Sequence, residues 1–262
     1  MSLIKTTDPI YFGGVNLLSV SGLSITGTDT FRYPNRDVKS FALTQTDKSV
    51  TTSAFYSSRP VNIRGIIVAT GREDLDTSIS ELRNILEAKN QTLQLPVFGL
   101  QRQLKNVTVS NVAFQDTAGG YTGFDIEFNA ADPFFYGTTL LEVLSVINLT
   151  SGNKSYPITF SGTAKQEPII RYIVDAVGST TSRIVSLINP ALEQTLAINR
   201  VWSVGDELIV NCSEKTVKVN GVDVEFTGTI LYWSRGAGHI NYTDEFSSRQ
   251  VDLNVSYYKR DL

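Results

Sequence analysis

The chain has 262 residues, of which 41% are hydrophobic, and it carries a formal net charge of −3 at pH 7. This length suits one large β domain or two of ordinary size, and the apolar content excludes wholesale disorder. The nearly balanced charge excludes nucleic-acid binding through a strongly basic surface. A single cysteine and a single histidine exclude an internal disulfide framework and the usual cysteine-rich or imidazole-rich metal sites.

The amino-terminal segment, Met1–Pro9, lacks the apolar core of a signal peptide. No run elsewhere approaches the roughly 20 apolar residues that a membrane-spanning helix needs. We therefore expect a soluble protein that is made in a cytoplasm and has no membrane partner.

Most of the sequence shows the alternating pattern, or the short β-branched runs, that are typical of strands. Phe124, Ile126 and Phe128 share one face of such a segment, while Asp125 and Glu127 take the other. This is the pattern of a half-buried strand, and the chain as a whole is predicted to be mainly β. The predicted strands include Val61–Val68, Asn106–Phe114, Tyr121–Phe128, Ile169–Val174, Arg183–Ile188, Glu207–Cys212 and Val251–Tyr258.

The segment 28–58 departs from this pattern because it mixes large apolar residues with many charged ones. A solvated loop does not need the apolar residues, and a strand of a self-contained sandwich does not need the charges. An extended arm that lies against a neighbouring subunit accounts for both, with aromatic rings buried and charges at a polar rim. The alternative is an edge hairpin whose rings pack within the same chain. The candidate subunit-contact residues of this arm are Phe31, Tyr33, Phe41, Phe55 and Tyr56.

One later segment has the 3.6-residue period of an amphipathic helix. Its apolar positions are Leu75, Ile79, Leu82, Ile85 and Leu86. Thr70 and Glu73 have the spacing of a capping box, and the acidic residues Glu73, Asp74 and Asp76 suit the positive start of a helix. The sequence therefore predicts a single helix over about residues 73–89, packed on a sheet.

A domain boundary is predicted just after the segment Ala131–Gly137, where Pro133 and Gly137 interrupt the strand pattern. The segment 150–155 that follows has the composition of a loop. We expect an N-terminal domain over residues 1–137 and a C-terminal domain over residues 138–262.

The dipeptide Asn220-Gly221 is the strongest turn signal in the C-terminal half. A two-residue type I′ turn at this position pairs Val219 with Val222 and Lys218 with Asp223. The valines of both strands are expected to share one face of the hairpin.

Residues for catalysis are few. A histidine base would have to be His239, which lies among glycines in a stretch typical of a turn, and no Gly-x-Ser-x-Gly motif supplies a serine. Cys212 alternates with Leu208 and Val210, so it is expected to face a core. A carboxylate pair is the remaining possibility, but neighbouring acids on a strand point to opposite faces. We expect no catalytic, metal or cofactor-binding residues and no enzymatic activity. The acids considered are Asp206, Glu207, Asp223, Glu225, Asp244 and Glu245.

Both tryptophans of the chain lie in the second half. Aromatic rings can stack on sugar faces, so Trp202, Tyr232 and Trp233 are candidates for glycan binding. The alternative is that they fill the core of a β-sandwich.

Several segments, in this order and spacing, resemble the distal tail protein (Dit) family of long-tailed siphophages. In the first half the matching segments are Tyr11–Asn16, Arg59–Val68, the helix entry Arg72–Leu75, a strand with Arg102, a strand ending at Phe114, Gly120–Phe128 and Asp132–Tyr136. In the second half, Gly205–Gly221 resembles the terminal module of that family, in which a strand leads into a hairpin with an Asn-Gly turn. The stretch 164–200 matches only as generic strands.

This resemblance implies a fold and a role. The N-terminal half would be a β-sandwich-like domain with one helix and an extended arm, and six copies would close into a ring at the distal end of the tail tube. The C-terminal half would be a galectin-like β-sandwich. The protein would be a structural component of the virion tail, made in the bacterial host cytoplasm. Its partners would be other copies of itself, the tail tube protein, a tail-associated hub or tip protein, and receptor-binding or side-fibre proteins. The alternative function is a carbohydrate-binding module of a phage or bacterial surface assembly that contacts host glycans.

Overall fold

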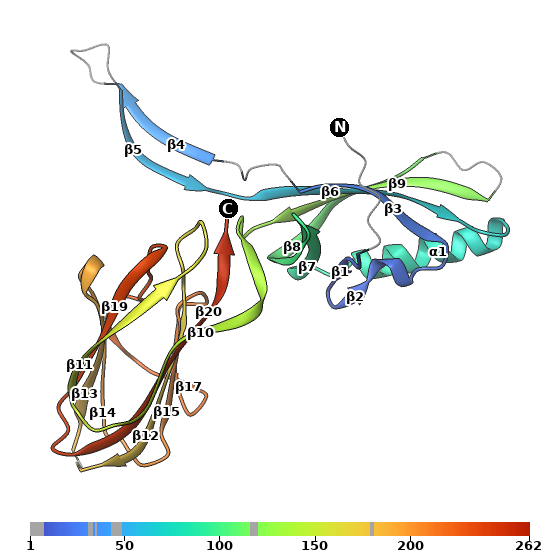
Figure 1. Cartoon of the computed structure of the whole chain (residues 1–262). Coiled ribbons are helices and arrows are strands. Elements are labelled where there is room, and N and C mark those ends of the chain that lie inside the picture. The colour runs from blue at the N-terminus through green and yellow to red at the C-terminus, as the bar shows by residue number, and fades with distance from the viewer. Residues whose placement is uncertain (1–7, 31–33, 35, 43–48, 116–119, 179–180) are drawn as a thin grey trace. The chain divides into compact units, whose positions relative to one another are not determined.

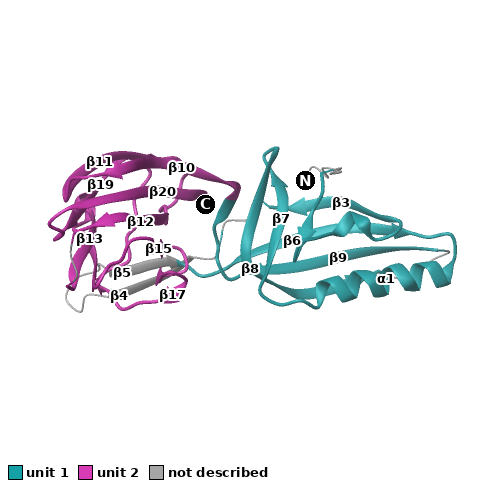
Figure 2. Ribbon diagram, turned by 90° about the horizontal axis from the view of Figure 1, so that it is seen from below, with its two compact units in different colours: residues 1–136, 262 teal, residues 137–261 magenta. Residues whose placement is uncertain are grey.

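The computed structural model describes residues 8–30, 34, 36–42, 49–115, 120–178 and 181–262, with the backbone alone for 36–42 and 49–55. The chain divides into two compact units, Met1–Tyr136 with Leu262 (unit 1) and Gly137–Asp261 (unit 2), shown in Figure 2. Each unit has its own hydrophobic core. The described part of the chain is mainly β with one α-helix, so the predicted fold class is confirmed. No described helix is long and apolar enough to cross a membrane.

Unit 1 is built on an antiparallel sheet. Its strands are β1 (Tyr11–Phe12), β2 (Val15–Asn16), β3 (Leu23–Asp29), β6 (Arg59–Val68), β7 (Gln91–Val97), β8 (Leu100–Phe114) and β9 (Tyr121–Ala130). They pair in the order β3–β6–β9–β8–β7–β1–β2. A short 3₁₀ helix, η1 (Leu17–Ser19), connects β2 to the segment before β3.

The alternation of apolar residues places one face of this sheet in the core of unit 1. Val61 lies opposite Phe128, and Ile63 lies opposite Ile126, across the β6–β9 pair. All four side chains are buried. Because residues directly opposite each other share a face, these pairs stack as a layer of the core. The half-buried strand predicted around Ile126 is therefore confirmed.

Helix α1 (Arg72–Leu86) packs on the same core and runs beside the sheet in Figure 1. Leu75, Leu82 and Leu86 are buried, while Ile79 and Ile85 are partly buried against the core. The predicted apolar stripe is therefore confirmed, although the helix ends at Leu86 rather than near residue 89.

The predicted capping box is wrong. Gly71 occupies the N-cap position in an extended conformation and makes no side-chain cap hydrogen bond. Thr70 lies one residue too early for its hydroxyl to reach the first turn of backbone N–H groups, and it donates to the carboxylate of Asp74 instead. Glu73 and Asp74 do lie in the first turn, where acidic side chains are favourable.

The segment predicted to form an arm contains two strands, β4 (Arg36–Ala42) and β5 (Ser49–Tyr56). They pair only with each other among the described strands, as an antiparallel two-stranded sheet in which Arg36 lies opposite Tyr56. In Figure 1, β5 leads into β6 through a short connection.

The chain passes from unit 1 to unit 2 within a strand rather than through a loop. Strand β10 (Phe135–Leu149) runs through Gly137, which was expected to interrupt the strand pattern. The next strand, β11 (Asn153–Phe160), includes residues that had the composition of a loop. A glycine is tolerated in a strand when neighbouring strands supply the backbone hydrogen bonds, and β10 is paired within the sheet order.

Unit 2 is a β-sandwich. One sheet has the order β17–β16–β15–β12–β20–β10, and the other has the order β11–β19–β13–β14–β18. The elements not yet bounded are β12 (Ile169–Val177), β13 (Arg183–Asn189), η2 (Pro190–Leu192), β14 (Gln194–Arg200), β15 (Glu207–Asn211), β16 (Thr216–Val219), β17 (Val222–Asp223), β18 (Thr227–Gly228), β19 (Gly236–Asp244) and β20 (Arg249–Asp261). Their inward faces form one core.

The hairpin predicted at Asn220-Gly221 is confirmed in its register, since Lys218 lies opposite Asp223 and Val219 opposite Val222. Both turn residues have the positive φ angles of a type I′ turn, 51° and 78°. Val219 and Val222 lie directly opposite each other and so share one face of the hairpin, as expected. Val219 is buried but Val222 is 68% exposed, because β17 is the last strand in its sheet order and ends after two residues.

We expect the substitution Leu82→Ala to lower the free energy of unfolding by about 2–5 kcal/mol, because this fully buried side chain joins α1 to the sheet. Denaturant unfolding followed by circular dichroism measures the loss. The control Asn84→Ala changes an exposed residue of the same helix and should cost less than about 0.5 kcal/mol. Equal effects of the two substitutions would show that α1 is not anchored by its apolar face.

Candidate functional site

His239 and Cys212, the residues considered for nucleophilic catalysis, lie in positions that do not suit it. His239 is exposed on β19 rather than in a turn, and its carbonyl oxygen accepts a hydrogen bond from Nε1 of Trp233 at 3.1 Å. Cys212 is buried in the core of unit 2, as predicted. Burial raises the pKa of its thiol to about 12, so the reactive thiolate is disfavoured at neutral pH.

The carboxylates considered for acid–base chemistry serve structural roles where they are buried. Asp206 accepts hydrogen bonds from the backbone N–H of Ser203 at 2.9 Å and from Nδ2 of Asn220 at 2.8 Å. It thus joins the loop before β15 to the β16–β17 turn. Its neighbour Glu207 forms an ion pair with Arg171 on the partly exposed face of the sheet. Among the described residues there is no cluster of three or more side chains suited to hold a metal ion.

The two tryptophans proposed to stack on glycans lie in the core instead. Trp202 and Trp233 are each 2% exposed. The indole nitrogen of Trp202 donates to the carbonyl of Arg183 at 3.1 Å. A ring that stacks on a sugar must offer an open face, and these rings have none.

Tyr232, the third candidate for glycan stacking, is partly buried. The ammonium group of Lys165 lies 3.5 Å from the centre of its ring, so this face is already occupied by a cation–π contact. The three candidates therefore do not form an exposed aromatic platform. Sequence spacing could not reveal this, because alternation alone does not distinguish the inner from the outer face of a sheet.

The candidate arm residues fall partly outside the described structure. Phe31 and Tyr33 lie outside the described residues, and only the backbone is described for Phe41 in β4 and Phe55 in β5. Tyr56 is partly buried, and its ring meets the ring of Phe134 edge to face with centres 6.0 Å apart. Tyr56 thus packs within its own chain, as expected under the alternative of an edge hairpin. A subunit contact through the rest of the arm remains a prediction.

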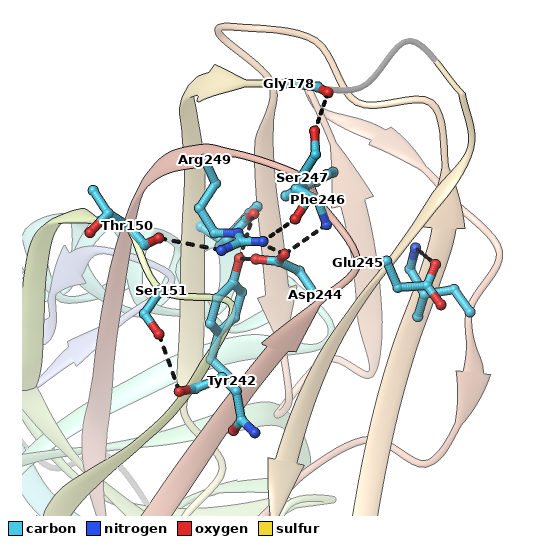
Figure 3. A network of polar contacts seen from close by, with 12 residues as sticks. Thr150, Ser151, Gly178, Tyr242, Asp244, Glu245, Phe246, Ser247 and Arg249 are labelled. Carbon is cyan, nitrogen blue, oxygen red and sulfur yellow. Dashed lines mark hydrogen bonds and ion pairs between the residues drawn. The ribbon is translucent and has the colours of Figure 1, made fainter.

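A polar network of unit 2 surrounds Asp244, whose side chain is fully buried (Figure 3). Nε of Arg249 lies 2.8 Å from Oδ1 of Asp244, and the arginine side chain is 12% exposed. The backbone N–H of Phe246 donates to the same oxygen at 2.9 Å. Together these contacts close the connection between β19 and β20.

Arg249 also fastens neighbouring connections to this network. Its Nη1 donates to the carbonyl of Thr150 at 3.3 Å, and its Nη2 donates to the carbonyl of Phe246. The backbone N–H of Asp244 donates to the carbonyl of Gly152 at 3.0 Å. A Cβ atom at Gly152 would lie 2.7 Å from the guanidinium carbon, so this position favours glycine. The β10–β11 and β19–β20 connections are therefore tied to each other.

Two tyrosines extend the network into the sandwich core. The hydroxyl of Tyr242 donates to Oδ2 of Asp244, and it lies 3.1 Å from the hydroxyl of Tyr172. Burial raises the pKa of both phenols far above the ordinary value, so both stay protonated. Because Tyr242 uses its proton toward Asp244, its oxygen accepts from Tyr172. The arrangement is a chain of hydrogen bonds joined to a buried ion pair, and it stabilises one end of the sandwich.

No protein-family model matches the chain, and no curated protein matches it by sequence. Solved structures do match it. The Dit protein of phage SPP1 (gp 19.1), a paradigm of the hub of the adsorption apparatus in phages that infect Gram-positive bacteria, aligns with a TM-score of 0.72 and 14% identity. The alignment covers 97% of this chain and 99% of the SPP1 protein. The chain has the fold of SPP1 Dit.

A second likeness is to chains of the phage P2 baseplate. A chain from the structure of the P2 baseplate in its activated conformation with Ca matches with a TM-score of 0.50 and 8% identity, over 92% of each chain. The corresponding structure with Sr gives the same TM-score and identity over 91% of each chain. Both likenesses extend over the two units. These folds therefore share the two-unit architecture and not only one common sandwich.

We expect Arg249→Met to lower the free energy of unfolding by about 3–5 kcal/mol, because it leaves the buried carboxylate of Asp244 without its cation. Chemical denaturation measures this loss. The matched control is Arg171→Met, which removes an ion pair of half-exposed groups and should cost at most about 1 kcal/mol. The double variant Asp244→Asn with Arg249→Met should recover part of the loss. Equal losses from the two single variants would contradict a structural role for the buried pair.

We expect the Cys212 thiol to be unreactive toward a disulfide reagent such as DTNB at pH 8 until the chain is unfolded. The unfolded thiol ionises near pH 9, whereas the folded thiol does so only at about 12. Because the fold favours the protonated form, this group's contribution to stability is present below pH 9 and is lost as the pH rises toward 12. Absorbance of the released thiolate gives the rate, and rapid labelling of the native protein would contradict the burial of Cys212.

Proposed function

We propose that this chain is a structural subunit of a bacteriophage tail. In this proposal it forms a ring at the distal end of the tail tube and connects the tube to the host-adsorption apparatus. The observation that carries the proposal is the likeness to SPP1 Dit over nearly the full length of both chains. The likeness covers 97% of this chain and 99% of the SPP1 protein, so it supports a whole-protein role rather than one shared module.

The organisation of the chain is suited to such a role. Subunits of a closed ring contact each other through two different surfaces, one at each side. Unit 1 offers an extended sheet with β3 and β2 at the two ends of its strand order, and the β4–β5 hairpin forms a sheet of its own. We assign ring formation to unit 1, with the hairpin as an arm that lies on a neighbouring subunit. The ring would contain six copies, as the resemblance to the Dit family implies.

Unit 2 is assigned to the attachment of other tail components. We propose that its sandwich, galectin-like in the family, carries receptor-binding or side-fibre proteins. A tail tube protein and a tail-associated hub or tip protein would contact the ring. The burial of Trp202 and Trp233 argues against the alternative of a carbohydrate-binding module that uses these rings.

The proposed role involves no turnover and no cofactor. The carboxylates of Asp206 and Asp244 accept hydrogen bonds from partners within the fold, and the thiol of Cys212 is held in its protonated form. These features support a protein that acts through its surfaces. The place of action would be the virion tail.

We expect the purified chain to assemble into a ring of six copies, or into two such rings joined head to head. Six copies of 28.8 kDa give a mass of about 173 kDa. Light scattering after size exclusion, over a series of protein concentrations, measures the mass, and negative-stain images show the ring directly. A monomeric mass at every concentration and at moderate salt would contradict the proposal.

A further inference from the structure

The turn between β16 and β17 has a sequence that favours a chemical modification. Asn220 and Gly221 have φ angles of 51° and 78°, and both residues are exposed. Glycine has no side chain, so the backbone nitrogen of Gly221 is open to approach by the side chain before it. A backbone nitrogen that reaches the carboxamide carbon of the preceding asparagine can close a succinimide ring. The chain has one Asn-Gly sequence, and it lies at this turn.

Three other asparagines have the same left-handed backbone conformation but a different neighbour. Asn90, Asn106 and Asn148 have φ angles of 55°, 53° and 57°. Each is followed by a residue with a large side chain, which crowds the backbone nitrogen that would have to react. Among the described residues, Asn220 alone combines this conformation with a following glycine.

In the folded chain, the side chain of Asn220 holds the loop between β14 and β15, residues 201–206. Its Nδ2 donates to Oδ1 of Asp206 at 2.8 Å, and its Oδ1 accepts from the backbone N–H of Glu207 at 2.9 Å. The backbone N–H of Asn220 also donates to the carbonyl of Glu207 at 2.9 Å. The carboxamide must leave these partners before it reaches the nitrogen of Gly221, so the reaction requires local opening of the turn.

Asp206 is the buried partner in this contact. Its Oδ2 accepts from the backbone N–H of Ser203 at 2.9 Å and lies 3.6 Å from a guanidinium nitrogen of Arg200. Its Oδ1 accepts the proton of the Asn220 amide. An ionised carboxylate has no proton to donate, so a carboxylate at position 220 cannot replace this amide. It would also repel the carboxylate of Asp206.

We propose that Asn220 is a deamidation site, and that its modification releases the loop 201–206 from the β16–β17 turn. The backbone nitrogen of Gly221 bonds to the side-chain carbonyl carbon of Asn220, and the bond from that carbon to Nδ2 breaks. Ammonia leaves with the proton of the Gly221 amide. Water then opens the succinimide, at the side-chain carbonyl to give aspartate or at the main-chain carbonyl to give isoaspartate. The sum is one water consumed and one ammonia released, with no oxidation or reduction.

Either product puts a carboxylate where the amide donor was. The lost hydrogen bond and the new repulsion act on the same contact, which ties the loop to the turn. Trp202 is buried and belongs to this loop, while Arg200 ends the strand before it. Opening of the loop therefore exposes the peptide bond after Arg200, which trypsin cleaves. This inference concerns unit 2 alone and does not depend on the proposed function.

The first experiment ages the full chain in warm, mildly alkaline buffer and then maps the modified residues by mass spectrometry. The aspartate and isoaspartate forms should accumulate in the tryptic peptide 219–235, which contains Asn220. Asn90, Asn106 and Asn148 are the internal controls and should stay unmodified while Asn220 reacts. An unmodified Asn220, or a control asparagine that reacts as fast, overturns the assignment of the site.

The second experiment uses Asn220→Asp in the full chain, which reproduces one product without ageing. An Asp-Gly sequence also suits a type I′ turn, so the change acts through the charge. Trypsin should cleave the folded variant after Arg200 about tenfold faster than the wild type, because a hydrogen bond to a buried charged group is lost. Asn211→Asp is the matched control. Asn211 uses its side-chain oxygen to accept from the N–H of Glu214, a role that a carboxylate keeps, so cleavage should not change.

A double variant separates repulsion from a general weakening of the turn. Asp206→Asn combined with Asn220→Asp exchanges the amide and the carboxylate, so one donor and one acceptor face each other again. The rate of cleavage after Arg200 should return close to the wild-type value. A double variant that is cleaved as fast as Asn220→Asp overturns the repulsion as the cause.

An unchanged cleavage rate in Asn220→Asp overturns the release of the loop. Each of these outcomes leaves the proposed tail function standing, because the measurements follow a contact within unit 2 and not the assembly of the ring.

Discussion

Both units depend on one constraint of antiparallel sheets, which is that a strand buries every second side chain while neighbouring strands take up its backbone hydrogen bonds. Tyr172 in β12 shows how this works in unit 2. Leu208 of β15 and Leu253 of β20 lie opposite it on its two sides. Its ring also meets those of Trp202 and Tyr242, with centres 5.7 and 5.6 Å away. One buried residue thereby connects three strands of one sheet with the opposing sheet.

Several buried polar side chains of unit 2 are held by partners within the fold. Asp244 is surrounded by donors from Tyr242, Phe246 and Arg249. At another place in unit 2, the buried amide of Gln166 donates to the carbonyl of Arg260 at 2.9 Å and accepts from its N–H at 3.0 Å, as a backbone strand would. Because an unpaired buried polar group costs free energy, each of these side chains fixes the connections around it.

Catalytic groups need unsatisfied or poised atoms in a cleft, whereas the buried acids and phenols of unit 2 have their partners inside the fold. Among the described strands, the β4–β5 hairpin pairs only with itself and is a sheet of its own. The full-length likeness to SPP1 Dit shows that the two units together have the fold of that protein.

The sequence alone determined the features that depend on local periodicity. The alternation around Ile126, the stripe on α1 and the Asn220-Gly221 turn were predictable because each arises from residues a few positions apart. The two-residue turn at Phe98-Gly99, which joins β7 to β8, was not recognised, since its only sequence signal was a glycine between two alternating runs and the aromatic residue before it is atypical.

Tertiary structure decided which face of a strand is buried and which distant residues meet. Trp202 and Trp233 are core residues because the two sheets of unit 2 pack together around them. Strand β10 continues through Gly137 because neighbouring strands supply its hydrogen bonds. Arg249 meets Thr150 across 99 positions of sequence, a pairing that only the packed sandwich creates. These outcomes depend on long-range contacts, whose residues carry no local pattern that identifies their partners.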